Sequence, residues 1–328
     1  MSGKDVRVVV TRQMPAPVEE ALAARYDVLF NRTDVALSAD QLVQVLQQAD
    51  VVVTTVTDKW HAGIFDTTNI RCRLLANVGV GVNHIALEAA RRAGISVSNT
   101  PDVVTDDTAD IAVALMLMVM RRLGEGERHL RSGAWGGLRP TFMLGRTLRG
   151  KTLGIVGYGR IGRAVARIAH DAFGMHILWQ APRDPRIDDP ATAGPAGAER
   201  VATLEALLAR SDVVSLHCPA TPETRHLINA QTLAHMRPDA YLVNTARGDV
   251  VHEAALVHAL KERTIAGAGL DVYEFEPSVT ADLLEMEQVV LIPHLGSATV
   301  ETRTNMGMRA LSNVEAFLAG QPVPDRVV

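Results

Sequence analysis

Residues 152–162 read Thr-Leu-Gly-Ile-Val-Gly-Tyr-Gly-Arg-Ile-Gly, and this stretch decides the fold. Gly157, Gly159 and Gly162 form the pattern G-x-G-x-x-G, which follows an apolar run and opens a segment of helical period. In a strand–turn–helix, the first glycine permits the tight turn, the second lets backbone approach a pyrophosphate, and the third lets helix pack on strand. The helix N-terminus then favours the anion. The stretch predicts a dinucleotide-binding unit rather than a plain glycine-rich turn.

Short apolar runs alternate with segments of helical period along nearly the whole chain. Most runs are apolar throughout, as strands covered on both faces are, so the rhythm predicts parallel sheets with helical crossovers. The strands are expected at 6–10, 27–30, 51–55, 74–78 and 96–99, and then at 152–156, 176–179, 213–217, 241–245, 267–271 and 289–292.

Two sheets are expected because a long apolar segment, residues 105–123, separates the two series of strands. We interpret this segment as one buried helix at the domain junction. The polar, Gly-rich insertion that follows, residues 124–150, is interpreted as a dimerisation arm, with a surface loop as the alternative. A final helical segment, 301–318, is expected to pack back on the first domain.

Length and composition narrow the class of protein. At about 100–200 residues per domain, 328 residues favour two domains. Two cysteines, Cys72 and Cys218, cannot form a disulfide framework, which favours a reducing compartment. A net charge of −4 argues against a nucleic-acid partner, and the longest apolar run, Ile111–Met120, is too short to span a membrane. We expect a cytoplasmic protein with no signal peptide.

The nucleotide preference is inferred from the end of the strand at 176–179. A site specific for NAD places an Asp or Glu about 20 residues after the glycine loop. Gln180 stands eighteen residues past Gly162, and its neutral amide would not repel a 2′-phosphate. Arg183 could bind that phosphate, although Asp184 beside it weakens the case and a solvated loop charge is the alternative. NADPH is therefore favoured, with NAD possible.

Three polar residues follow strands at the sheet edge where doubly wound folds bind ligands. Arg247 follows the run 241–245, Glu276 follows 267–271, and His294 follows 289–292. Periodicity alone does not show that they meet, but their shared edge favours it. For any one of them alone, a structural ion pair or a strand-end histidine is the simpler alternative.

These motifs together resemble the D-isomer-specific 2-hydroxyacid dehydrogenase family. The resemblance runs from about residue 70 to the C-terminus, in order, through the glycine loop, Asn244-Thr245-Ala246-Arg247-Gly248, the run from Gly269 to Pro277, and Pro293-His294-Leu295-Gly296. Glyoxylate/hydroxypyruvate reductases are the most similar subfamily, on the strength of Trp135, Arg139-Pro140, Leu144-Gly145 and residues 150–154.

The resemblance implies a fold and an activity. It implies two doubly wound parallel-sheet α/β domains: a Rossmann cofactor domain, residues 104–297, inserted in a flavodoxin-like substrate domain, residues 1–103 plus 298–328. The implied activity is NAD(P)H-dependent reduction of small 2-oxo acids, such as glyoxylate and hydroxypyruvate, to D-2-hydroxy acids in a homodimer. The alternatives are a 3-phosphoglycerate or other D-2-hydroxyacid dehydrogenase, or a nucleotide-sensing protein similar to a corepressor.

The resemblance also implies roles that physical chemistry supports. His294 would be the general acid that protonates the carbonyl oxygen; its ordinary pKa of about 6.5 means that it needs help to carry the proton at pH 7. Glu276 would favour the imidazolium and fix the ring. Arg247 would bind the substrate carboxylate and polarise the carbonyl.

Further positions are carried over from the family motif. Val80 and Gly81 would offer backbone N–H groups to the substrate, although Asn83 and Ala86 replace acids that are common after that loop. Trp135 would cover a substrate cleft or, equally, anchor a dimer. Asp271 would face the nicotinamide or, alternatively, form a turn, and Thr108 would contact the cofactor or bond at the helix start. No metal site is expected. The remaining expected cofactor contacts are Arg160, Ile161, Cys218, Pro219, Thr224, Thr245, Ala246 and Gly296.

Overall fold

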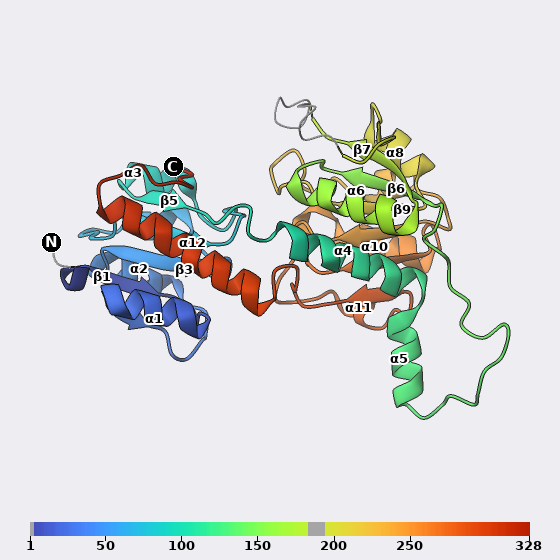
Figure 1. Ribbon diagram of the computed structural model, residues 1–328, viewed down its shortest axis with the longest axis horizontal. Helices are drawn as coiled ribbons and strands as arrows, with labels where there is room; N and C mark the ends of the chain where they lie inside the picture. Colours follow the sequence, from blue (N-terminus) through green and yellow to red (C-terminus); the bar gives the residue numbers. More distant parts are fainter. Residues whose placement is uncertain (1–2, 183–193) are drawn as a thin grey trace. The chain divides into compact units, whose positions relative to one another are not determined.

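The computed structural model describes residues 3–182 and 194–328. The chain divides into two compact units, Met1–Val104 with Ala298–Val328 and Thr105–Ser297. Each unit has a parallel sheet of its own, and Figure 1 labels the elements of both. The division falls at the start of the helix expected between the two series of strands.

The first unit is a five-stranded parallel sheet with helices on both faces. Its strands run in the order β2-β1-β3-β4-β5, which is the flavodoxin-like order. One apolar core contains Val8 and Val53, and the other contains Val9 and Val52, because alternate residues of a strand face opposite sides of the sheet. The strands are β1 (Arg7–Val10), β2 (Asp27–Phe30), β3 (Val51–Thr55), β4 (Leu74–Val78) and β5 (Ser96–Ser98). The helices are α1 (Ala16–Arg25), α2 (Ala39–Gln48), α3 (Leu87–Arg92) and α12 (Val300–Leu318).

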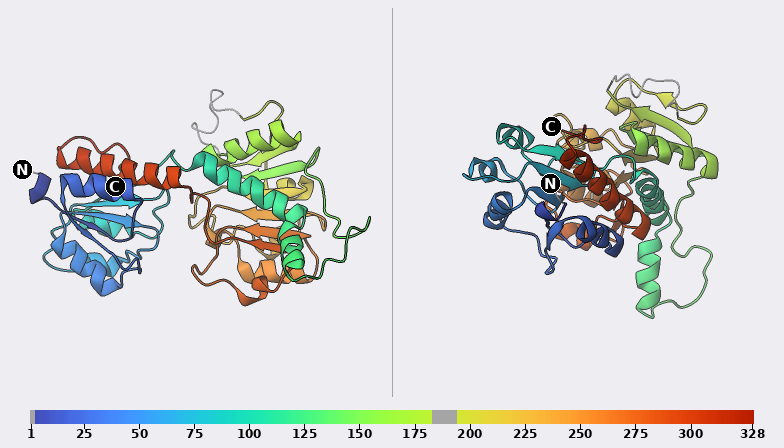
Figure 2. Two further views of the ribbon diagram at one scale, coloured as in Figure 1. Left: turned by 60° about the horizontal axis from the view of Figure 1, so that its bottom comes forward. Right: turned by 60° about the vertical axis from the view of Figure 1, so that its left-hand side comes forward.

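Helix α12 and the C-terminal tail complete this unit. α12 packs on α1 and β4 (Figure 2), and Gly307 allows the close approach, since a Cβ there would lie 2.6 Å from the Val18 side chain. The tail then pairs with β5, where Val327 N donates to Val97 O at 2.7 Å. The buried Asp325 carboxylate anchors the tail by accepting hydrogen bonds from Arg309 Nε at 2.6 Å and Asn313 Nδ2 at 3.1 Å.

The second unit is a seven-stranded, wholly parallel sheet in the order β12-β11-β10-β9-β6-β7-β8. Read from β8 to β11, this is the strand order of a Rossmann fold, with β12 added at the edge. The fold class expected from the sequence is therefore confirmed for both units. The strands are β6 (Thr152–Val156), β7 (His176–Gln180), β8 (Glu199–Arg200), β9 (Val213–Leu216), β10 (Tyr241–Asn244), β11 (Gly267–Leu270) and β12 (Val289–Leu291). The helices are α4 (Thr105–Met120), α5 (Leu123–Arg131), α6 (Arg160–Phe173), α8 (Leu204–Arg210), α9 (Ala230–Leu233), α10 (Glu253–Lys261) and α11 (Ala281–Leu284).

The expected single helix over 105–123 is instead two helices. The apolar helix α4 packs on β10, β11, β12 and α6, and ends at Met120. Arg122 takes a left-handed conformation with φ of 55°, and the chain turns into α5, which has no buried residue. The insertion interpreted as a dimerisation arm is helical in its first part, where the ion pairs Arg122–Glu125 and Arg131–Glu127 support a polar helix. None of the helices in the described residues is long and apolar enough to cross a membrane.

Replacing Asp325 should weaken the first unit. Arg309 and Asn313 hold the pKa of this carboxyl below its usual range against the opposing effect of burial. Asp325→Asn should therefore lower the free energy of unfolding by about 2 kcal/mol at pH 7, measured by urea unfolding. Because a lowered pKa adds stability only above the unfolded-state value, the difference from wild type should shrink below about pH 4. Asp282→Asn, which removes an exposed ion pair with Lys261, is the control and should change little; equal losses in both variants would contradict the anchoring role.

Candidate active site

The glycine loop between β6 and α6 contains three glycines that the protein needs for different reasons. Gly157 has φ of 91°, and a Cβ there would lie 2.5 Å from Cys218 N. A Cβ on Gly162 would lie 2.3 Å from Gly157 O, so helix and strand could not keep their spacing. A Cβ on Gly159 would meet nothing within 4 Å. The fold itself therefore requires Gly157 and Gly162, whereas Gly159 leaves open space at a helix end.

This open space fits the pyrophosphate of a dinucleotide. Gly159 is the N-cap of the fourteen-residue helix α6, and no side chain caps that end. The free N–H groups and the helix dipole favour an anion there. The strand order also reverses between β6 and β9, which is where doubly wound sheets bind ligands.

Polar atoms without a partner lie at the ends of the neighbouring strands. Among the described residues, Thr245 Oγ1, after β10, and His217 Nδ1, after β9, are buried with no hydrogen-bond partner. Burial lowers the pKa of His217 to about 3, so this imidazole is neutral. Burial also raises the pKa of the adjacent Cys218 thiol to about 11, so it is not a nucleophile at neutral pH. Unsatisfied polar atoms beside the glycine loop are consistent with a ligand that supplies their partners.

Arg247 presents a half-buried cation without a carboxylate partner in the described part of the chain. Asn244 Nδ2 donates to Arg247 O at 2.9 Å, and Asn244 Oδ1 accepts from Ala246 N at 3.0 Å, which fixes the backbone after β10. The Arg247 guanidinium donates to Ala246 O and makes no ion pair within the described part of the chain. Burial lowers its pKa, while the nearby charges of Glu276 and Asp249 raise it. A desolvated guanidinium of this kind is suited to bind an anionic ligand.

Glu276 and His294 form a hydrogen-bonded pair, as their shared sheet edge suggested. His294 Nδ1 lies 3.0 Å from Glu276 Oε2, and Tyr273 N donates to Glu276 Oε1 at 3.0 Å. Burial on its own would raise the pKa of Glu276, but the hydrogen bond and charge of His294, the Tyr273 amide and the Arg247 charge lower it below its usual range. Glu276 is therefore an anion, and its position leaves His294 Nε2 as the ring nitrogen available to a substrate.

The loop that carries His294 is held by Asp271 and Thr108. Asp271 is 1% exposed, and its two carboxylate oxygens accept from Leu295 N and Gly296 N. Thr108 lies inside α4, and its hydroxyl donates to Gly296 O at 3.0 Å. The cofactor contacts expected of Asp271 and Thr108 stay predictions, but both polar groups already support the loop.

In the first unit, the loop after β4 exposes two backbone N–H groups. Asn77 Nδ2 donates to Gly79 O at 3.0 Å and to Gly81 O at 3.1 Å, while Asn99 Nδ2 donates to Val80 O at 2.9 Å. The carbonyl groups of Gly79, Val80 and Gly81 therefore all accept hydrogen bonds. Within the described ranges, the N–H groups of Val80 and Gly81 have no acceptor. Two adjacent free N–H groups are a typical site for a carboxylate. The sequence reasoning missed the two asparagines, although an amide beside each strand end was a signal for such loop bonds.

The other expected site residues lie in varied environments. Arg160 and Ile161 begin α6, and Gln180 ends β7, where its carbonyl accepts from Gly157 N. The Thr224 hydroxyl donates to Pro219 O at 2.6 Å, so it is used within its own turn. Trp135 is 53% exposed in the segment after α5, and Arg183 lies outside the described residues. Within the described chain, no group of three His, Cys, Asp or Glu side chains is placed to hold a metal.

Comparison with known proteins identifies the family. Residues 113–296 match the model of the D-isomer specific 2-hydroxyacid dehydrogenase, NAD binding domain. The chain is 42% identical over 325 residues to a glyoxylate reductase of Thermococcus litoralis, an alignment covering 98% of this chain and 96% of the relative. We conclude that the chain belongs to the D-isomer-specific 2-hydroxyacid dehydrogenase family of oxidoreductases.

Solved structures agree with this assignment. A putative D-isomer specific 2-hydroxyacid dehydrogenase from Polaromonas superposes with a TM-score of 0.91 at 33% identity, covering 98% of this chain and 99% of that one. An NADPH-dependent glyoxylate/hydroxypyruvate reductase from Sinorhizobium meliloti, in complex with NADP and malonate, gives a TM-score of 0.85 at 32% identity, covering 98% and 97%. The resemblance inferred from the motifs is therefore confirmed at the level of the family.

Alanine at two glycines of the loop should have opposite consequences. Gly159→Ala should fold normally but raise the Kd for NADPH by at least about tenfold, because the methyl group enters the space left for the pyrophosphate. Gly162→Ala should lower the free energy of unfolding by about 1–3 kcal/mol, because its methyl group collides with Gly157 O. Nucleotide fluorescence titration and urea unfolding separate the two effects. Gly63→Ala, at another glycine with open space, should change neither quantity; wild-type affinity in Gly159→Ala would contradict the assignment.

Proposed function

We propose that this protein reduces small 2-oxo acids, glyoxylate and hydroxypyruvate in particular, to D-2-hydroxy acids with NADPH as the preferred reductant. The observation that carries the proposal is the Glu276–His294 pair at the same sheet edge as Arg247, a half-buried cation that makes no ion pair within the described residues. The names of the relatives from Thermococcus litoralis and Sinorhizobium meliloti support this choice of substrates.

The proposed reaction divides the work among residues of this chain. Arg247 binds the carboxylate of the 2-oxo acid and polarises its carbonyl. In the first unit, the N–H groups of Val80 and Gly81 are the proposed donors to a substrate carboxylate. His294 donates its Nε2 proton to the carbonyl oxygen, while the hydrogen bond between Nδ1 and Glu276 fixes the orientation of the ring. A nicotinamide dinucleotide bound at the glycine loop supplies the hydride. Glu276, whose pKa is lowered by its hydrogen bond with His294 and by the Tyr273 amide, stays in place as the acceptor for Nδ1 throughout this transfer.

The preference for NADPH rests on the residues at and after the end of β7. Gln180 ends that strand, in the place where an acidic residue would repel a 2′-phosphate. Arg183 supplies a cation three residues further on in the sequence. The Sinorhizobium meliloti relative, which is named as NADPH-dependent, adds support.

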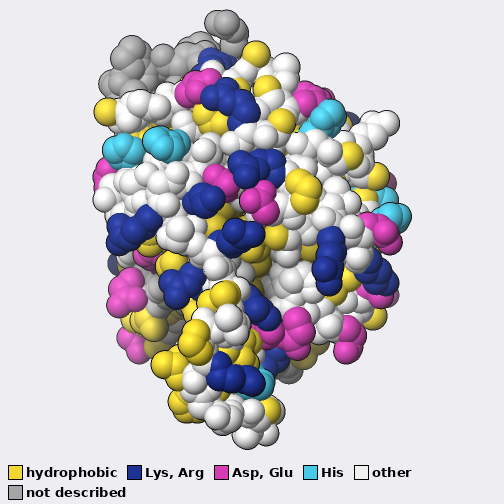
Figure 3. All heavy atoms as spheres, turned by 90° about the vertical axis from the view of Figure 1, so that its right-hand side faces the viewer, with side chains coloured by type: hydrophobic (Ala, Val, Ile, Leu, Met, Phe, Trp, Pro, Cys, Tyr) yellow, Lys and Arg dark blue, Asp and Glu magenta, His cyan; other side chains and the backbone are white. Residues whose placement is uncertain are grey.

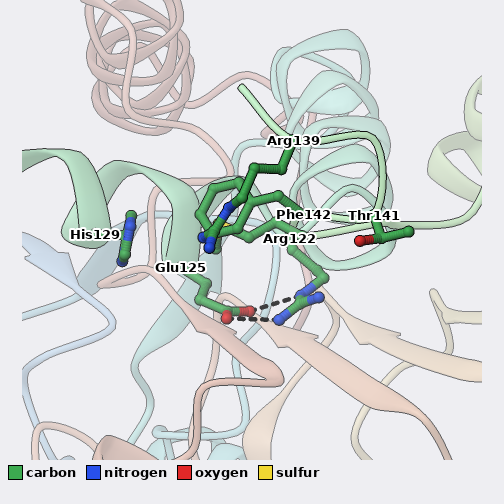
Figure 4. A pocket seen from close by; sticks show the side chains of 7 residues that line it. Arg122, Glu125, His129, Arg139, Thr141 and Phe142 are labelled. Carbon is green, nitrogen blue, oxygen red and sulfur yellow. Dashed lines mark hydrogen bonds and ion pairs between the residues drawn. The ribbon is translucent and has the colours of Figure 1, made fainter. Parts of the chain in front are cut away.

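The segment from α5 to residue 150 has the features of a dimerisation arm. It carries exposed apolar side chains, among them Leu130 at 61% and Leu138 at 91% exposure, and Figure 3 shows hydrophobic side chains gathered over this part of the molecule. A hollow of about 380 Å³ lies between α5 and the following segment (Figure 4). In its lining, the Arg139 guanidinium carbon lies 4.8 Å from the centroid of the Phe142 ring. We include in the proposal a homodimer joined through this arm; the cytoplasmic location expected from the sequence stays a prediction.

Initial rates with glyoxylate, hydroxypyruvate, pyruvate and 2-ketogluconate, each with NADPH and NADH, test the activity. We expect the highest kcat/KM for glyoxylate or hydroxypyruvate with NADPH. His294→Ala should lower kcat by about 10²–10⁴-fold, because no group replaces the proton donor, while binding NADPH as wild type does. His170→Ala, which breaks an exposed His–Asp pair in α6, should leave kcat unchanged. Absence of turnover with every 2-oxo acid would overturn the proposed activity, and faster turnover with NADH would overturn the nucleotide preference.

The arm can be tested by its effect on assembly. Leu138→Asp together with Trp135→Ala should convert the dimer into a monomer in sedimentation-velocity measurements, because the exposed apolar surface of the arm is lost. Val35→Asp, at a residue of the first unit that is 66% exposed, should leave the assembly unchanged. A wild-type chain that sediments as a monomer would refute the dimer directly.

A further inference from the structure

Two glutamates, Glu253 and Glu274, lie near the Glu276–His294 pair in the fold and take no part in the proposed chemistry. Glu253, at the start of α10, and Glu274 are both nearly buried, with 3% of Glu253 and 6% of the Glu274 side chain exposed. Each carboxylate accepts a hydrogen bond from the other residue's backbone: Glu274 N donates to Glu253 Oε1 at 2.7 Å, and Glu253 N donates to Glu274 Oε2 at 3.1 Å. The reciprocal bonds fasten the segment after β11 to the N-terminus of α10.

The remaining oxygens of the two carboxylates are also occupied. The Thr280 hydroxyl donates to Glu253 Oε2, and His226 Nε2 lies 2.6 Å from Glu274 Oε1. All four oxygens therefore have partners, which is the condition under which a buried charged network is stable. His226 is partly exposed, since 27% of its side chain remains accessible. It can be replaced without opening the core.

His226 brings a third segment of backbone into the network. Its N–H donates to Asp249 O at 2.8 Å, and its ring lies 4.6 Å from the ring of His252, the N-cap of α10. The network thus joins the turn after β9, the segment between β10 and α10, and the segment after β11. We call these four side chains, His226, Glu253, Glu274 and Thr280, the glutamate clamp.

Two of the joined segments carry the proposed active-site residues. Arg247 immediately precedes Gly248, which packs against the Tyr273–Glu274 peptide so closely that a Cβ there would lie 1.8 Å from Tyr273 C. Glu276 follows Glu274 by two residues and receives the Tyr273 N–H at 3.0 Å. Any movement of Glu274 away from Glu253 would displace the peptide on which both Gly248 and Glu276 depend.

We propose that the glutamate clamp is a positioning device, in which His226 and Glu274 hold Glu276 at hydrogen-bond distance from His294 and keep its segment in place beside Arg247. None of the clamp residues touches the reacting atoms. This inference rests on the proposed function for its kinetic consequence, but its structural consequence, a fixed Glu276–His294 hydrogen bond, exists without substrate.

His226→Ala is the test, with His226→Gln as the conservative variant. The alanine leaves Glu274 Oε1 without a partner, whereas the glutamine amide can still donate to it. His226→Ala should lower kcat roughly tenfold, because small displacements of a proton-transfer pair are costly, with the KM for NADPH unchanged, and His226→Gln should recover most of the loss. His170→Ala, which removes a histidine from an exposed His–Asp pair of the same unit, is the matched control and should match wild type.

The pH dependence separates positioning from simple loss of structure. Asp271 and Arg247 are the other charged groups that act on the Glu276–His294 pair, and neither is altered in His226→Ala. The hydrogen bond with His294 lowers the pKa of Glu276, so a looser Glu276 should become protonated at a higher pH, and the loss of reduction rate on the acid side should begin at a higher pH in His226→Ala. A variant that merely unfolds in part would lose the same fraction of its rate at every pH.

Proton NMR gives a readout that needs no turnover. The downfield N–H signal of His294, assigned by its loss in His294→Ala, should be sharp in wild type and His226→Gln and broadened or absent in His226→Ala. A wild-type signal and rate in His226→Ala would overturn the clamp. An inactive wild type with the NMR difference intact would overturn the proposed function while supporting the clamp.

Discussion

All seven strands of the second unit run parallel, and this single constraint decides where its chemistry can lie. Helices cover both faces of such a sheet, so its central strands are largely apolar, whereas the short edge strand β8 consists of Glu199 and Arg200. Most of the polar groups that can meet a ligand therefore lie in the first residues after a strand. Because the strands are parallel, those residues all emerge at one edge: Gly157 after β6, Arg247 after β10 and His294 after β12.

Buried carboxylates then fix the loops at that edge. Asp271 accepts the Leu295 and Gly296 amides, Glu253 and Glu274 accept each other's amides, and Glu276 accepts the Tyr273 amide. A carboxylate that accepts backbone N–H groups stabilises one loop conformation, which suits a site where side chains must keep their positions. Arg247 differs, since it is a half-buried charge that donates to Ala246 O and makes no ion pair within the described residues. The contrast between satisfied anions and this unsatisfied cation gives the edge its preference for an anionic molecule.

Much of the fold could be predicted from the sequence, because strand and helix periods and the glycine loop are local signals. The strand series and α12 lie close to where periodicity places them. The break after Met120 was missed, since an apolar run gives no sign of the left-handed turn at Arg122. The two-residue strand β8 was also missed, because it carries too few residues for a period.

The site was less accessible to sequence reasoning, since its bonds join residues that are far apart in the chain. Thr108 bonds to Gly296, 188 positions away, and nothing local distinguishes this from a hydroxyl kept for a ligand. The three glycines of the loop illustrate the limit most clearly. The sequence pattern does not distinguish them. In the structure, a side chain on Gly157 or Gly162 would collide with backbone atoms, whereas Gly159 faces open space. The fold has room for a larger side chain at Gly159, which lies at a helix end without a side-chain cap. Packing within the protein therefore does not explain why this residue is glycine. For Gly159 that argument leads from packing alone to a bound anion.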